Sequence, residues 1–228
     1  MKFFDMVVVI TGGSKGFGKG LAEAFIKEKS KVIITSNNED ELKIASEEIG
    51  CDYFVSDASS YDNCVTLVDS IKANYSEIDV WVNNAGIQIA PSNLEDVDIE
   101  KLHKLFSINY FGYFYGCKAV LKEMKESGTG TIININSTAG LGGKPGLSAY
   151  VSSKFAIKGM TESLREELKD TEIKVFQVFP GGMKTDIYRE KVPADIGDYM
   201  DISYAIDKVM DNFNLSEPEL DLVIKRPV

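Results

Sequence analysis

Tyr150 and Lys154 are the residues of this chain whose types and spacing best fit acid–base chemistry. They stand four positions apart, and Ser137 lies thirteen positions before Tyr150, at the end of an apolar run. If residues 148–169 form a helix, side chains at i and i+4 share one face, so the phenol and the ammonium can converge. A positioned phenol can exchange a proton with a reacting oxygen. The pair therefore outlines an acid–base site.

Spacing alone does not identify such a site, because a second Tyr-x-x-x-Lys occurs at Tyr204 and Lys208 without a preceding serine or glycine turn. An amphipathic side chain on a solvated helix face is the ordinary explanation of the pattern. The elements around each pair must separate the two.

Short β-branched runs alternate with longer segments of helical periodicity, such as Phe17, Leu21 and Phe25. This alternation predicts an α/β fold with a parallel sheet between two layers of helices, a three-layer, doubly wound arrangement. The chain fits one domain, 1–228, with an irregular loop at about 184–201. The predicted seven strands are 6–11, 32–35, 53–55, 80–82, 131–135, 175–179 and 222–224.

Composition limits the partners and the chemistry. The 35 acidic and 25 basic residues give a net charge of −10, which opposes binding to nucleic acid or anionic membranes. Cys51, Cys64 and Cys117 lack the close spacing of metal or redox motifs and are expected to be reduced thiols in a cytoplasmic protein. His103 is the only histidine, so no metal site is expected. No signal peptide or membrane span is expected.

The first predicted strand runs into a glycine-rich turn, Thr11-Gly12-Gly13-Ser14-Lys15-Gly16-Phe17-Gly18, and a helical pattern begins at once. Glycines permit a tight turn and let a pyrophosphate approach the backbone at a helix N-terminus. The spacing Gly-x-x-x-Gly-x-Gly differs from the Gly-x-Gly-x-x-Gly of other dinucleotide-binding folds. An ordinary strand-to-helix turn is the alternative interpretation.

These motifs together resemble the short-chain dehydrogenase/reductase family. The glycine turn is similar to the family's cofactor turn, Asn83-Asn84-Ala85-Gly86 to its turn after the fourth strand, and Pro180-Gly181 with Thr185 to its nicotinamide loop. The matching motifs span residues 6–185 in the family's order. The resemblance implies a Rossmann-type NAD(P)-dependent oxidoreductase that forms a homodimer or homotetramer.

The resemblance also implies a catalytic set of four residues. Tyr150 is expected to be the general acid/base, which requires its pKa to fall from about 10 toward neutrality. Lys154 and an oxidised nicotinamide would stabilise the phenolate, and Lys154 would also reach the ribose hydroxyls. Ser137 would hydrogen-bond the substrate oxygen. Asn109 would hold the geometry that relays the proton through Lys154, unless it only satisfies helix backbone.

The expected cofactor is NADP(H), with NAD(H) as the alternative. Ser36 occupies the position, about 20 residues beyond the glycine turn, where a carboxylate would favour NAD(H). Lys15 adds a cation for a 2′-phosphate, although Asn37 stands where many similar NADP-dependent proteins have arginine. Asp57 resembles the family residue that contacts adenine, and a strand-end turn is its alternative role. The expected cofactor-binding residues are Gly12, Ser14, Lys15, Gly16, Phe17, Gly18, Ser36, Asn37, Asp57, Ala58, Asn84, Ala85, Gly86, Tyr150, Lys154, Pro180, Gly181, Met183 and Thr185.

The substrate is expected to be a small or apolar carbonyl or alcohol, because the residues expected to line its pocket are mostly apolar and include no arginine to clamp a carboxylate. They are Gln88, Leu141, Leu147, Gly182, Ile187 and Tyr188. The loop at 184–201, with a helical stub at 186–189, is short for a lid, so an open site is expected. A 3-oxoacyl-[acyl-carrier-protein] reductase and a non-catalytic nucleotide-sensing protein are the alternatives. Aromatic residues near Asn109 are expected to form core and a dimer face: Phe106, Tyr110, Phe111, Tyr113, Phe114 and Tyr115.

Overall fold

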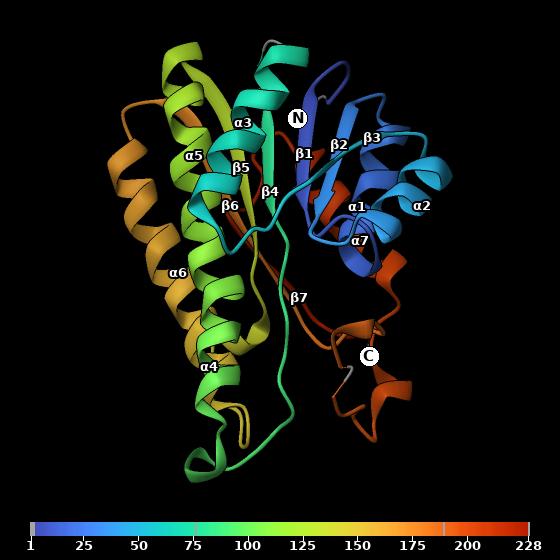
Figure 1. Cartoon of the computed structure of the whole chain (residues 1–228), viewed down its shortest axis with the longest axis vertical. Helices are drawn as coiled ribbons and strands as arrows, with labels where there is room; N and C mark the ends of the chain where they lie inside the picture. The colour runs from blue at the N-terminus through green and yellow to red at the C-terminus, as the bar shows by residue number, and fades with distance from the viewer. Residues whose placement is uncertain (1–2, 76, 189, 228) are drawn as a thin grey trace.

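Seven parallel strands form one sheet in the computed structural model, which describes residues 3–75, 77–188 and 190–227. The strand order is β3-β2-β1-β4-β5-β6-β7, so the chain winds outward in both directions from β1 and β4 (Figure 1). All seven predicted strands are confirmed, with ends that differ by a few residues. Their bounds are β1 (Val7–Thr11), β2 (Lys31–Ser36), β3 (Asp52–Val55), β4 (Val80–Asn83), β5 (Thr129–Ile135), β6 (Glu172–Pro180) and β7 (Asp221–Ile224).

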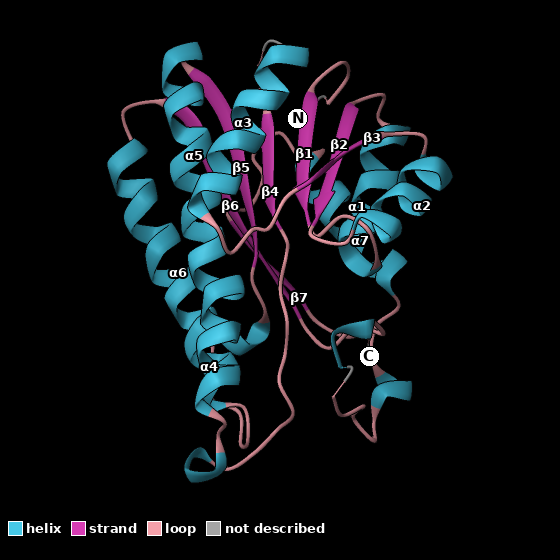
Figure 2. Ribbon diagram, in the orientation of Figure 1, coloured by secondary structure: helices cyan, strands magenta, loops and turns pink. Residues whose placement is uncertain are grey.

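Helices cover both faces of the sheet, as the alternating pattern predicted (Figure 2). One face carries α1 (Gly16–Lys27), α2 (Glu39–Ile49) and α7 (Ile202–Phe213). The other carries α3 (Tyr61–Tyr75), α5 (Gly112–Ser127) and α6 (Ser148–Leu168), and α4 (Ile99–Phe106) packs against α6. The fold is therefore a doubly wound, three-layer Rossmann arrangement in one domain.

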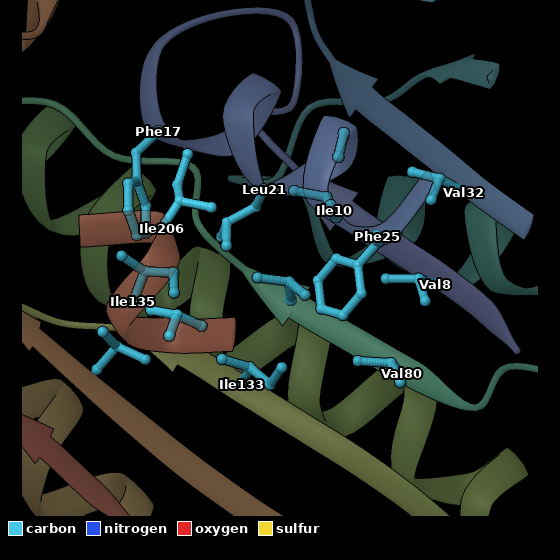
Figure 3. Close-up of a cluster of buried hydrophobic side chains, with 14 of the residues drawn as sticks. Val8, Ile10, Phe17, Leu21, Phe25, Val32, Val80, Ile133, Ile135 and Ile206 are labelled. Carbon is cyan, nitrogen blue, oxygen red and sulfur yellow. The ribbon is translucent and has the colours of Figure 1, made fainter. Parts of the chain in front are cut away.

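Each sheet face has its own hydrophobic core. Val8 and Ile10 of β1 point toward α1 and α7, whereas Val7 and Val9 point toward α3 and α5. Figure 3 shows the first cluster, in which Phe25 lies between strand residues and helix residues. Burial on both sides explains why the strands are almost continuously apolar. Trp81 is fully buried in the second core.

The segments that follow the strands gather at the carboxyl edge of the sheet, at the lower end in Figure 1. Residues 184–201 contain the short helical turns η4 (Asp186–Tyr188) and η5 (Ile196–Asp198), so η4 covers most of the expected stub, whose last residue lies outside the described ranges. A bridge between Met183 and Met200 joins the two ends of this loop. No helix of the described ranges is long and apolar enough to cross a membrane.

Candidate active site

A cavity of about 1020 Å³ lies at the carboxyl edge of the sheet. Every residue expected to bind the cofactor lines it, and so do Asn109 and Ser137. The second Tyr-x-x-x-Lys pair, Tyr204 and Lys208, lies on α7 and is absent from the described lining. The fold thus brings one of the two pairs, and only that one, to the glycine turn.

The glycine turn is fixed by the turn that follows β4. The Asn84 amide donates to Thr11 O at 2.9 Å and to Gly12 O at 3.0 Å, and the Thr11 hydroxyl accepts from Asn84 N at 3.0 Å. A Cβ on Gly12 would lie 2.8 Å from Ala85 Cα, and one on Gly18 would lie 2.4 Å from Asn84 Nδ2. These contacts leave no room for side chains at the two glycines.

The N-terminus of α1 opens into this cavity and fits an anionic group. Gly16, its first residue, has φ +56°, a left-handed conformation that glycine adopts without strain. In the part of the chain that the structure describes, the N-cap residue Lys15 makes no side-chain hydrogen bond to the N–H groups of the helix, and the first turn of α1 carries no acidic residue. Backbone N–H groups at such an end are available to a phosphate. The turn therefore has the donors and the close backbone approach that a pyrophosphate needs.

Glu41 is a cavity residue that sequence reasoning missed. Its Oε2 lies 2.5 Å from Lys15 Nζ and 3.4 Å from the Ser14 hydroxyl. Asn38 caps α2 by accepting a hydrogen bond from Glu41 N at 3.1 Å, which places Glu41 in the first helical turn. Three consecutive acids, Glu39, Asp40 and Glu41, begin α2, and among the described contacts it is Glu41 that pairs with Lys15. Lys15 is therefore not a free cation.

Asp57 has the turn role that was its alternative interpretation. Its Oδ1 accepts from Ser59 N at 2.9 Å and from the Ser59 hydroxyl at 2.7 Å, directly after β3. The residue also lines the cavity. Its carboxylate thus orders the loop that follows β3 at the rim of the cofactor region.

Tyr150 and Lys154 are buried on α6, with exposed fractions of 9% and 4%. Lys154 Nζ donates to Ile135 O at 3.1 Å and lies 5.7 Å from the centroid of the Tyr150 ring. It also lies 5.4 Å from the ring of Tyr113, whose hydroxyl donates to the same carbonyl at 2.7 Å. The carboxyl end of β5 therefore positions the ammonium beside the phenol.

Ser137 lies two residues beyond β5 and contacts Tyr150 of α6. Its hydroxyl hydrogen-bonds the Tyr150 hydroxyl, and its Oγ accepts from Ala139 N at 3.1 Å at the start of η3 (Thr138–Gly140). The Asn136 side chain accepts from Ser137 N at 3.0 Å. Two hydroxyls that can share one substrate oxygen are therefore held together.

Burial dominates the acid–base properties of this pair. It raises the pKa of Tyr150 to about 12, against the smaller lowering effect of the Ser137 hydrogen bond. It lowers the pKa of Lys154 to about 7. Desolvation of the phenolate thus outweighs the hydrogen bond from Ser137, so the net shift of the phenol's pKa is upward.

Asn109 lies in η2 (Ser107–Phe111), a π-helical turn between α4 and α5. Its side chain is fully buried. The amide accepts from Ile87 N at 2.8 Å and donates to Ile87 O at 2.9 Å, and its Nδ2 lies 3.3 Å from the Ser153 hydroxyl. Asn109 therefore fixes the loop after β4 against α6, instead of satisfying its own helix.

The expected substrate residues separate into two groups. Gln88, Leu147, Gly182, Ile187 and Tyr188 line the cavity, each from a segment that follows a strand. Leu141 is not part of the described lining, and its side chain is 45% exposed.

The substrate side of the cavity is more basic than its expected residues suggested. Arg226 also lines the cavity, although the residues expected to line the substrate pocket included no arginine. Arg226 follows β7, and the carboxyl ends of parallel strands meet at one edge, which is the signal that could have found it. Four lysines also line this side: Lys101, Lys104, Lys144 and Lys191.

One ion pair crosses the opening of the cavity. The Glu190 carboxylate accepts from Lys101 Nζ at 2.9 Å through both oxygens and from Ala90 N at 3.0 Å. These contacts tie the loop at 184–201 to α4 and to the segment after β4.

Comparison with known proteins gives consistent matches. The family model described as short chain dehydrogenase matches residues 6–196. An NADP-dependent (R)-specific alcohol dehydrogenase of Lentilactobacillus kefiri is 36% identical over 188 residues, covering 79% of this chain and 74% of that protein. A 3-alpha-(or 20-beta)-hydroxysteroid dehydrogenase of Mycobacterium bovis is 33% identical over 197 residues, covering 86% and 75%.

Solved structures show the same arrangement. A short-chain dehydrogenase from Streptomyces avermitilis has a TM-score of 0.86 at 27% identity, covering 96% of this chain and 88% of that one. An alcohol dehydrogenase from the archaeon Thermococcus sibiricus has a TM-score of 0.88 at 23% identity, covering 98% and 99%, and so shares the fold. With the family model matching most of the sequence, this chain belongs to the short-chain dehydrogenase/reductase family of oxidoreductases, which act on alcohol or ketone substrates with a nicotinamide cofactor.

Proposed function

We propose that this protein interconverts a carbonyl compound and its alcohol, with NADP(H) preferred over NAD(H) and Tyr150 as the general acid/base. The observation that carries the proposal is the convergence of Tyr150, Lys154 and Ser137 in the cavity that also receives the N-terminus of α1. A cofactor cradle and a proton donor in one cavity are the two parts that a hydride transfer at a carbonyl needs.

The bound nicotinamide would supply or accept the hydride. Among the protein groups, the Ser137 hydroxyl donates a hydrogen bond to the substrate oxygen, and the Tyr150 hydroxyl delivers the proton as the alcohol forms. Lys154, whose pKa burial lowers to about 7, exchanges protons near neutral pH and reaches the ribose hydroxyls. Asn109 holds the loop after β4, which forms the wall of the cofactor region.

The preference for NADP(H) rests on Lys15 and on the absence of a carboxylate at Ser36, and the relative from Lentilactobacillus kefiri is named as NADP-dependent. Glu41 weakens this preference because its carboxylate already contacts Lys15. The strength of NADP(H) selection therefore depends on how readily a 2′-phosphate displaces one carboxylate.

The test is to replace Tyr150 with Phe after a panel of carbonyls and alcohols has identified a substrate by nicotinamide absorbance. Tyr150→Phe should lower kcat by about 100-fold or more, the usual worth of acid–base catalysis, and leave cofactor affinity within about twofold. Tyr204→Phe is a matched control, since Tyr204 also precedes a lysine by four positions but lies outside the described lining. Undiminished turnover of Tyr150→Phe contradicts the assignment. A 3-oxoacyl thioester on acyl carrier protein belongs in the panel, as the alternative activity.

A cytoplasmic homodimer or homotetramer remains part of the proposal. Phe111, Phe114 and Phe155 are each more than 40% exposed on neighbouring helices of one face. Large apolar side chains gathered in this way are typical of a surface that another subunit covers. Sedimentation velocity would distinguish dimer, tetramer and monomer.

A further inference from the structure

The cavity is basic although the chain is acidic. Seven cationic and four acidic side chains line it, a formal balance of +3, whereas the whole chain carries −10. On the cofactor side the formal charges cancel, because two cations and two carboxylates lie there: Lys15, Lys154, Glu41 and Asp57. The excess lies on the substrate side.

Apart from the Lys101–Glu190 ion pair, this excess consists of four cations and the carboxylate of Asp186, and we call the four cations the basic rim: Lys104, Lys144, Lys191 and Arg226. They come from α4, the segment before α6, the loop at 184–201 and the segment after β7. Within the described ranges no acidic side chain forms an ion pair with the three lysines, whereas Arg226 is paired with Asp195 at 3.4 Å and Lys101 with Glu190. Four separate segments of the chain thus each contribute a cation to one opening.

Two sets of contacts connect the rim to the reacting groups. Lys144 Nζ lies 3.4 Å from the Thr138 hydroxyl, in the residue next to Ser137. On the other wall the Arg226 guanidinium lies 4.4 Å from the centroid of the Tyr199 ring, which packs on Tyr188 with centroids 5.5 Å apart.

Tyr188 in turn lies close enough to the reacting phenol for Tyr150 to raise its pKa, while Arg226 lowers it, both on top of the larger effect of burial. The four rim side chains are exposed and line the cavity that holds Tyr150, so their charge is available to a ligand that enters from solvent.

We propose that the natural substrate carries an anionic group, a carboxylate or a phosphate, which the basic rim attracts and orients while its carbonyl faces Tyr150 and Ser137. This inference rests on the proposed function and names its substrate class. A cleft lined by one sign of charge concentrates ligands of the opposite sign and speeds their association. The proposed substrate class differs from the expected small or apolar carbonyl or alcohol, because that expectation did not include the rim residues that the fold adds to the cavity.

The cofactor's own phosphates do not account for the rim. They require the glycine turn and the N-terminus of α1, which lie on β1 and its following helix. The rim residues lie on other elements, and two of them are linked to expected substrate residues. Leu147 N donates to Lys144 O, and Arg226 lies over Tyr199, which packs on Tyr188. Cofactor affinity should consequently be unaffected when the rim is neutralised, and this difference can be measured.

The experiment compares matched substrates in three proteins. The pairs are an oxo acid against its methyl ester, and a hydroxyketone phosphate against the free hydroxyketone. The proteins are the wild type, a rim variant with Lys104→Gln, Lys144→Gln and Lys191→Gln, and a control with Lys122→Gln, Lys125→Gln and Lys169→Gln. The control lysines are exposed and absent from the described lining, and the change in net charge is the same.

In at least one pair the wild type should have a higher kcat/KM for the anionic substrate than for the neutral one. At low salt, kcat/KM for the anionic substrate should fall about tenfold in the rim variant. The kcat/KM of the rim variant for the neutral substrate and that of the control protein for both substrates should change little. Added salt should reduce the wild-type advantage. The pair with the larger ratio identifies the anion as carboxylate or phosphate.

Equal kcat/KM for both members of each pair in the wild type would overturn the inference. So would a rim variant that loses cofactor affinity, measured by fluorescence titration, without losing charge discrimination. Failure of the proposed function would instead appear as the absence of turnover with every carbonyl, or as a fully active Tyr150→Phe variant.

Discussion

Replacing Glu41 with Gln should shift the cofactor preference toward NADP(H). Lys15 is the cation expected to meet a 2′-phosphate, and its Nζ lies 2.5 Å from Glu41 Oε2. A phosphate at this point must displace the carboxylate or bind beside it. Glutamine keeps the size and hydrogen-bonding capacity of the side chain and removes its charge, so it isolates the electrostatic effect.

The magnitude follows from the exposure and charge of the groups. Lys15 and Glu41 are 40% and 36% exposed, so their ion pair stabilises the protein by only about 0.2–1 kcal/mol. At a separation of about 5 Å in water's dielectric, a carboxylate and a doubly charged phosphate repel by about 1.5 kcal/mol. Removing Glu41 should therefore improve binding of a 2′-phosphate by about 1–2 kcal/mol, or about 5- to 30-fold.

Calorimetry with two nucleotides separates this effect from catalysis. Adenosine 2′,5′-bisphosphate carries the 2′-phosphate, and adenosine 5′-monophosphate lacks it. Glu41→Gln should tighten the first and leave the second unchanged or slightly weaker, whereas Lys15→Ala should weaken the first more than the second. Glu39→Gln removes the same charge from the first turn of α2, at an exposed residue outside the described lining, and should change neither.

If Glu41→Gln changed the dissociation constants of both nucleotides equally, the reasoning would be refuted, because only the bisphosphate carries the 2′-phosphate that would meet Glu41. An effect of the same size in Glu39→Gln would also refute it, since it would show a long-range effect of net charge. Higher salt should reduce the gain, as the two groups are partly exposed.

Three further changes test the site. Lys154→Met should abolish turnover yet raise the unfolding free energy, measured in urea, by about 4 kcal/mol at pH 7 and by only about 1 kcal/mol at pH 10. The reason is that burial lowers the pKa of this lysine to about 7, so the folded state binds fewer protons than the unfolded state between pH 7 and 10.5. Equal gains at both pH values would contradict this. Gly18→Ala should destabilise the protein by about 1–3 kcal/mol and weaken nucleotide binding, whereas Gly159→Ala, where a Cβ meets no described atom within 4 Å, should do neither. Glu190→Gln should speed hydrogen exchange at pH 7 in the loop at 184–201. The exchange rate of the wild type should approach that of the variant as pH falls below 4.5, since the hydrogen bond from Lys101 holds the pKa of the Glu190 carboxyl below that value.

The sequence predicted the fold well because strands buried on both faces leave a strong local signal. Val7–Thr11 and Lys31–Ser36 are apolar runs between turn residues, and the alternation of runs with helical periodicity implies their parallel pairing. The expected cofactor residues also meet in one cavity, since most of them lie at or soon after the carboxyl end of a strand and these ends share an edge, while Tyr150 and Lys154 reach it from α6.

Residues that act through distant contacts left no such signal. Glu41 is one of three consecutive acids, and only the capping of α2 by Asn38 determines which of them faces Lys15. Arg226 and Glu190 lie in irregular segments whose placement depends on tertiary packing. The pKa of Tyr150 could not be inferred from side-chain types, because it depends mainly on burial.

Because Ser107–Phe111 forms a π-helical turn, the number of residues in this turn matters for the position of Asn109 as much as their types do. A π-turn holds one residue more than an α-turn, so deleting a single residue from it would give a regular helix of unchanged hydrophobicity. The same deletion would rotate everything on one side by about 100° and take the Asn109 amide away from both backbone atoms of Ile87. A substitution between α4 and α5 can be judged at its own position, but inserting or deleting one residue there would change the orientation of every site residue on one side of the turn.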